Sequence, residues 1–235
     1  MKNKIKNKTI GILGGMGPQA SSYLYDLIIK KSIKDYGVID NKDFPDIVLF
    51  SISIPDFIGN SKNKPNALRV LKQKVEDANK IGLSCLSMAC NTAHILLPDI
   101  QKNMKMPFIS LIDEVARETN DLNIKKVGLL GTPTTLKSNL YQKALAKYKI
   151  KAVTPSKNQF SSIESVIRRV ISGKQNEKDQ QTLQIIAHGL KKEGAQGIIL
   201  GCTELPLAFP KKIDLPVLNS VEVLADALLR HYYAA

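Results

Sequence analysis

Apolar positions along the chain follow two alternating periods. Short runs of aliphatic and β-branched residues, typical of buried strands, alternate with longer stretches whose apolar residues recur three and four positions apart, typical of amphipathic helices. The predicted strands cover 9–13, 47–52, 81–88, 107–111, 126–130, 197–200 and 215–218. The predicted helices cover 19–34, 67–79, 136–148, 163–171, 183–192 and 221–232. This alternation predicts an α/β fold with parallel sheets and functional loops at the carboxyl ends of the strands.

The chain also repeats itself weakly. The stretch IGILGGMGP at 10–18 parallels VGLLGTPT at 127–134, and SMACNTAH at 87–94 parallels ILGCTELP at 199–206. We therefore expect two pseudo-symmetric domains, each a mostly parallel sheet flanked by helices, with the active site in the cleft between them. The first domain is predicted to comprise 1–115 and 211–235, and the second 116–210. Because no low-complexity linker is present, the connection near 111–123 should be short and ordered.

Composition and charge narrow the function classes. Hydrophobic residues make up 43% of the 235 residues, enough for a sizeable core. The net charge of +13 comes from 34 Lys and Arg against 21 Asp and Glu. Beyond the N-terminal lysines, these basic residues are scattered rather than clustered, which favours a solvated surface over a nucleic-acid interface.

Hydropathy and cysteine usage bear on location. No apolar run approaches the roughly 20 residues that cross a bilayer, so we expect a soluble protein with no membrane partner. Three cysteines do not form the dense, even framework of a small secreted fold. The prediction is a cytoplasmic protein whose cysteines remain thiols.

Two cysteines occupy similar places in the two halves. Cys90 follows the apolar stretch 83–89 and precedes NTAH, and Cys202 follows 198–201 and precedes TELP. Both are predicted at strand-to-helix junctions, where free N–H groups and the helix dipole favour a thiolate and hold an anionic group. A single such cysteine is more often a small buried hydrophobe, but two at equivalent junctions favour a functional pair.

A pair of thiols suits one kind of chemistry. Inverting the α-carbon of an amino acid requires one group that accepts a proton and another that donates one on the opposite face. A thiolate and a thiol exchange these roles between the two directions of reaction, provided that their pKa values are lowered by the surroundings. The charge that develops on the substrate carboxylate must then be stabilised electrostatically.

Three ordered motifs carry a resemblance to a known family. GGMGP at 14–18, CNTAH at 90–94 and GCTELP at 201–206, together with LLGTPTTL at 129–136, resemble the aspartate/glutamate racemase family over nearly the whole chain. The resemblance implies an interdomain active site, no cofactor, commonly a homodimer, and aspartate or glutamate as the favoured substrate. It also implies that Cys90 and Cys202 transfer the protons. By the same likeness, the substrate-binding residues are Met16, Asn91, Thr92, Thr132, Thr135 and Thr203.

One departure bears on the substrate. Aspartate racemases of this family carry an arginine after Ile-Pro-Asp that pairs with the side-chain carboxylate, whereas here Phe57 follows IPD at 54–56. A lysine that those enzymes use further along has no secure match, since only Lys157, Arg168 and Arg169 lie in the corresponding region. Losing this carboxylate partner should weaken discrimination for aspartate and permit a broader range of amino acids.

Two other function classes remain open. Gly15, Gly17 and Ala20 fit a variant of the dinucleotide-binding turn, which would indicate an oxidoreductase, although no acidic residue follows a second strand at the expected distance. The glycines also suit a tight turn with close backbone packing, which the racemase resemblance requires as well. The other class is an amino-acid-binding protein with this fold and no turnover.

The remaining candidates are supporting residues. Cys85, Cys90, Cys202 and His94 lack metal-ligand spacing, so no metal site is predicted, and Cys85 is expected in the core of its strand. His94 lies one helical turn after Cys90 and would either tune it, cap the helix or pack. Glu204 would cap its own helix or bind the substrate ammonium group.

Overall fold

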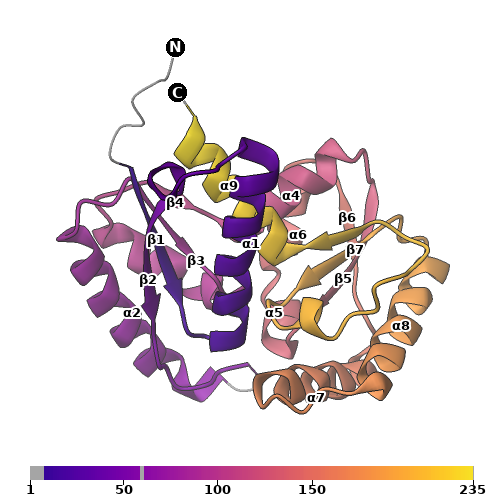
Figure 1. Cartoon of the computed structure of the whole chain (residues 1–235). Helices are drawn as coiled ribbons and strands as arrows, with labels where there is room; N and C mark the ends of the chain where they lie inside the picture. The colour runs from indigo at the N-terminus through magenta and orange to yellow at the C-terminus, as the bar shows by residue number, and fades with distance from the viewer. Residues whose placement is uncertain (1–7, 59–60, 235) are drawn as a thin grey trace.

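The computed structural model describes residues 8–58 and 61–234. In it, the chain forms two four-stranded parallel sheets, one in each half (Figure 1). The strand order is β2-β1-β3-β4 in the first sheet and β6-β5-β7-β8 in the second, so the two halves share one topology. The strands are β1 (Thr9–Gly14), β2 (Asp46–Ser51), β3 (Cys85–Met88), β4 (Phe108–Ile109), β5 (Lys126–Gly131), β6 (Lys151–Val153), β7 (Ile198–Gly201) and β8 (Val217–Asn219). The predicted α/β class with two related halves is confirmed.

Helices flank both sheets. The α-helices are α1 (Pro18–Tyr36), α2 (Lys64–Asn79), α3 (Leu97–Ile100), α4 (Leu111–Asp121), α5 (Pro133–Ser138), α6 (Leu140–Ala146), α7 (Phe160–Ile171), α8 (Glu177–Lys192) and α9 (Ser220–Tyr233). Short 3-10 helices cover Asn41–Asp43, Ser61–Asn63, Thr92–Leu96, Gln101–Asn103, Lys157–Gln159 and Leu205–Leu207. Among them, α1 and α9 lie in the middle of the molecule between the two sheets (Figure 1).

A shared core holds the two halves together. Helix α9 packs against α1 and α4, and α4 packs against α6. The buried cluster at this contact joins Ile10 and Leu24 of the first half to Leu129, Tyr141 and Leu224 of the rest of the chain. Two separate clusters lie under α2 in the first half and under α7 and α8 in the second. Because apolar burial is shared at the centre, the carboxyl ends of β1, β3, β5 and β7 are held near one another.

Three points of the secondary-structure prediction need correction. The expected connection at 111–123 contains helix α4, which begins at the N-cap Ser110, whose side chain accepts a hydrogen bond from the Asp113 N–H. The predicted helix at 136–148 is two helices, because Asn139 adopts the left-handed conformation with φ 58° between them. Strand β6 was not predicted, since its short sequence KAV has an exposed lysine and only partly buried neighbours.

The domain boundaries stay a prediction, with one correction. Strand β8 pairs with β7, so Val217–Asn219 belongs to the second sheet although 211–235 was assigned to the first domain. The following helix α9 does pack on α1, as that assignment requires. Within the described ranges, no helix is long and apolar enough to span a membrane.

Candidate active site

A tight glycine turn connects β1 to α1. Gly15 has φ 84°, and a Cβ there would lie 2.3 Å from the Ile52 nitrogen, so only glycine fits. The Gly15 N–H donates to the Ser21 hydroxyl at 2.8 Å, and the Gly17 N–H donates to Glu204 Oε1 at 3.0 Å. Both N–H groups are therefore engaged within the protein rather than presented to a pyrophosphate, and the turn packs the first half against the second.

Cys90 lies just beyond the end of β3 and is partly buried. Its sulfur accepts hydrogen bonds from the backbone N–H groups of Thr92 and Ala93, at the start of the 3-10 helix Thr92–Leu96. Burial, followed by the charge of Glu204, raises the pKa of the thiol to about 12. The predicted lowering of the Cys90 pKa is therefore wrong, because a one-turn 3-10 helix does not outweigh desolvation.

Cys202 occupies the corresponding position after β7 and is 4% exposed. Its thiol donates to Glu204 Oε2 at 3.0 Å. Burial, the Glu204 carboxylate and the charge of Cys90 together raise the pKa of Cys202 well above its ordinary value, again contrary to the prediction. The predicted α-helix is absent at this point, where a turn leads into the 3-10 helix Leu205–Leu207.

Glu204 connects the Cys202 junction to the glycine turn. Its carboxylate is 3% exposed and accepts hydrogen bonds from the Gly17 N–H, the Cys202 thiol and the Thr203 hydroxyl. Its side chain makes no capping hydrogen bond, so the predicted capping role is wrong. The alternative, a contact with the substrate ammonium group, stays a prediction.

Threonine hydroxyls meet across the two halves. The Oγ1 atoms of Thr92, Thr132 and Thr135 form a triangle with each pair 3.0 Å apart. Thr132 also caps α5 by accepting the Thr135 N–H at 3.0 Å. All three side chains are buried, Thr92 from the first half and the other two from the second. The structure thus brings together three of the predicted binding residues, with Thr92 lying 40 positions from Thr132 and 43 from Thr135 in sequence.

Buried polar contacts also hold the segment after Cys90. The Asn91 amide donates to the Ser220 hydroxyl at 3.1 Å and accepts from the Tyr141 hydroxyl. His94 Nδ1–H donates to the Cys90 carbonyl oxygen at 2.8 Å, and burial lowers the pKa of this histidine to about 4. The neutral His94 ring therefore supports the backbone of Cys90 rather than its sulfur. Tyr141 and Ser220 escaped prediction because they belong to helices remote in sequence.

A cavity of about 330 Å³ opens at the carboxyl ends of the strands, lined by residues of both halves. Of the predicted residues, it is lined by Gly15, Met16, Gly17, Cys90 and Thr92. Thr132 and Thr135 lie behind the wall, in contact with Thr92. Cys202 and Thr203 do not line the cavity but contact Glu204, and all four residues are almost fully buried. Cys85 is fully buried in the core, as expected.

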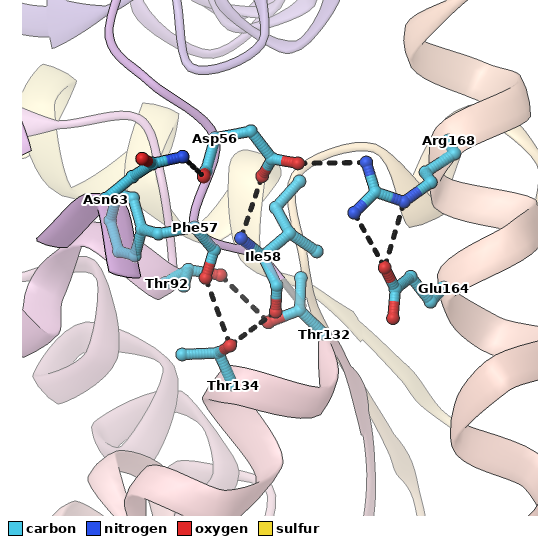
Figure 2. Close-up of polar contacts among 9 residues, drawn as sticks. All are labelled: Asp56, Phe57, Ile58, Asn63, Thr92, Thr132, Thr134, Glu164 and Arg168. Atoms are coloured by element: carbon cyan, nitrogen blue, oxygen red, sulfur yellow. Dashed lines mark hydrogen bonds and ion pairs between the residues drawn. The ribbon is translucent and has the colours of Figure 1, made fainter. Parts of the chain in front are cut away.

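The rest of the cavity wall includes residues to which no role was assigned. The cleft loop, residues 54–58, supplies Asp56, Phe57 and Ile58, and α7 supplies Arg168 and Ile171. Asp56 Oδ2 accepts from Arg168 Nη1 at 2.9 Å, and the Thr134 hydroxyl donates to the carbonyl oxygens of Phe57 and Ile58 (Figure 2). The loop of the first half is therefore tied to two helices of the second.

Known proteins share this arrangement. The Asp/Glu/Hydantoin racemase family matches residues 13–228. The broad specificity amino-acid racemase RacX of Bacillus subtilis (strain 168) is 26% identical over 96% of this chain and 98% of its own length. An aspartate racemase homologue from Pyrococcus horikoshii OT3 superposes with TM-score 0.79 at 29% identity, covering 96% of this chain and 99% of that one. The Picrophilus torridus aspartate racemase gives TM-score 0.80 at 27% identity, covering 96% and 94%. The chain therefore belongs to the Asp/Glu/hydantoin racemase family, as an amino-acid racemase.

Proposed function

We propose that Cys90 and Cys202 catalyse racemisation as two acid/base thiols on opposite faces of the substrate α-carbon, without a cofactor. The observation that carries this proposal is their placement. Each follows the equivalent strand, β3 or β7, of two sheets with one topology, and each strand is paired with the first strand of its half. The two sulfur atoms also interact electrostatically, since the charge of Cys90 raises the pKa of Cys202.

Repulsion between two thiolates favours the pair in which only one cysteine is ionised, and the reaction needs this state. Two buried like charges do not ionise together, so loss of one proton leaves one thiolate and one thiol. Cys90 accepts two backbone N–H groups, which favour its thiolate. Cys202 donates to Glu204, which favours its thiol. Once the pair has lost one proton, Cys90 is therefore the base and Cys202 the acid, and the roles reverse after turnover.

The α-carboxylate of the substrate is assigned to the hydroxyl triangle. Thr92 lines the cavity next to Cys90, and Thr132 and Thr135 hold its hydroxyl from behind. Hydroxyl donors aimed at the carboxylate stabilise the negative charge that develops when the α-proton leaves. This placement brings the α-carbon beside the Cys90 sulfur.

The substrate range depends on the cavity residues that lie beyond the threonine hydroxyls. Aspartate or glutamate as substrate stays a prediction from the family resemblance. The Bacillus subtilis relative is described as having broad specificity, and Phe57 stands where aspartate racemases have an arginine. Both points support a range wider than acidic amino acids. Cytoplasmic location and a homodimeric state likewise stay predictions.

Single-cysteine variants test the mechanism. We expect Cys90→Ser and Cys202→Ser each to lower racemisation by more than about 100-fold, because general acid/base groups typically contribute this much. In D2O, each variant should retain α-hydrogen exchange for one enantiomer only, since one face keeps its thiol. Chiral chromatography and NMR measure the two quantities. Cys85→Ala is the matched control and should keep near wild-type activity, because Cys85 is buried in the core.

Two results would contradict the proposal. Full racemisation by either serine variant would reject the pair of thiols. Thermal stabilisation by amino acids with no exchange in the wild-type protein would instead support the binding-protein alternative.

A further inference from the structure

The cavity wall beyond the thiols is mostly apolar. Ile54 and Phe57 on the cleft loop and Ile171 on α7 face the same cavity as Cys90. Phe57 is 5% exposed and packs with the core cluster under α2. An amino acid anchored at the threonine hydroxyls would extend its side chain along these groups, which suits a methylene stem rather than a short polar one.

Charge in this cavity is confined to one pair. Of the described residues that line it, only Asp56 and Arg168 are charged, and both side chains are about half exposed, at its solvent side. Arg168 is shared between two carboxylates, since Nη1 pairs with Asp56 at 2.9 Å, and Nε and Nη2 pair with Glu164 at 2.9 and 2.7 Å (Figure 2). The second oxygen of Asp56 accepts the Ile58 N–H at 2.8 Å, which fixes the carboxylate. The three side chains together carry one net negative charge.

We propose, on the basis of the function proposed above, that Asp56 and Arg168 form the side-chain subsite and select amino acids with an apolar stem and a basic end over aspartate and glutamate. An acidic side chain would bring a third carboxylate to a single guanidinium group. A lysine-like ammonium group would instead neutralise the cluster by joining Asp56. One unit-charge interaction at about 4 Å near a protein surface is enough for a tenfold preference, which corresponds to about 1.4 kcal/mol.

Substrate panels test this subsite. We expect the wild-type kcat/KM for racemisation to follow lysine, then norleucine, then glutamate, with lysine about tenfold or more above glutamate. Asp56→Asn should lower the value for lysine about tenfold, leave norleucine within about threefold and raise glutamate, because Arg168 is partly released. Glu164→Gln is the companion variant. It removes a carboxylate from the same arginine but leaves Asp56 in the cavity wall, so glutamate should gain, norleucine should stay within about threefold, and lysine should lose less than in Asp56→Asn.

The outcomes separate this subsite from the racemase mechanism. A wild-type enzyme that prefers glutamate to lysine would overturn the subsite while leaving the thiol mechanism intact. Equal losses for all three substrates in Asp56→Asn would do the same, by showing a merely structural role. No racemisation of any amino acid would reject the proposed function itself. The wild-type panel decides the preference even if the Asp56 variant does not fold.

Discussion

The two cysteine junctions follow equivalent strands, yet the protein surrounds the two sulfur atoms differently. Cys90 is partly exposed, lines the cavity and accepts N–H groups from Thr92 and Ala93. Cys202 is buried and donates its proton to the Glu204 carboxylate. A repeated fold therefore sets where the thiols lie, while the residues that follow each strand influence which of them loses its proton more readily.

The largest change in the pKa of Cys202 is expected when the carboxylate beside it is removed. In Glu204→Gln, the pKa of Cys202 should fall toward its ordinary value, because Glu204 raises it both by charge and by accepting its proton. The thiolate population at fixed pH should rise more than about tenfold, as a charge within about 4 Å contributes several times RT. The pH at which racemisation increases should then move lower, since more thiolate is present at each pH.

The titration can be followed residue by residue. Cysteine labelled with 13C at Cβ reports each thiol by NMR as the pH is raised, and the chain has only three. Glu222→Gln removes an equal charge from the exposed face of α9 and should leave all three titrations unchanged. An unshifted Cys202 midpoint in Glu204→Gln would mean that burial alone separates the two thiols.

A smaller effect, on folding stability, is expected at the Cys90 junction, where the neutral His94 ring bonds the Cys90 carbonyl oxygen. The pKa of His94 is lowered from 6.5 to about 4 in the folded protein, so the unfolded chain binds its proton more tightly between these values. Stability that depends on neutral His94 is complete above about pH 6.5 and decreases as the pH falls toward 4. At pH 5, the loss should be about 2 kcal/mol relative to pH 7.

Urea unfolding at the two pH values measures this loss. Carboxylates also contribute to acid sensitivity, so the informative quantity is the difference between wild type and His94→Gln, which lacks the titrating ring. His231→Gln is the control on the partly buried end of α9. Equal pH dependence in wild type and His94→Gln would show that the ring is not held neutral by its surroundings.

Local patterns in the sequence were sufficient to predict most of the strands and the positions of the two cysteine junctions. Strands β3 and β7 are buried apolar runs, and Cys90 and Cys202 come just after them, so the apolar pattern alone located both junctions. Helix α4 also had a readable signal, with Ser110 at its N-cap, acidic residues in its first turn and apolar residues at helical spacing. It was overlooked because a linker was expected between the halves.

The rest of the site depends on contacts that no local pattern encodes. Asp56 and Arg168 are separated by 112 positions, and each alone is an ordinary surface charge. Burial, which follows from how the two halves pack, is the largest cause of the raised pKa of each thiol, and the charge of Glu204 adds to both. The sequence therefore indicated the two candidate thiols, and the packing of the halves determines most of the shift in their pKa values.

The smallest expected effect concerns the hydroxyl triangle, where the two junctions meet. Thr135→Val keeps the shape of the side chain but removes one of the hydroxyl groups that join Thr92 to α5. We expect a loss of about 1 kcal/mol in unfolding free energy, the usual contribution of a buried hydrogen bond, together with a severalfold rise in KM because Thr92 is less well oriented. Thr119→Val is the matched control, since its buried hydroxyl bonds only within α4, to the Val115 carbonyl. It should cost similar stability with KM unchanged, whereas equal KM values in the two variants would mean that the triangle joins the halves without orienting the substrate.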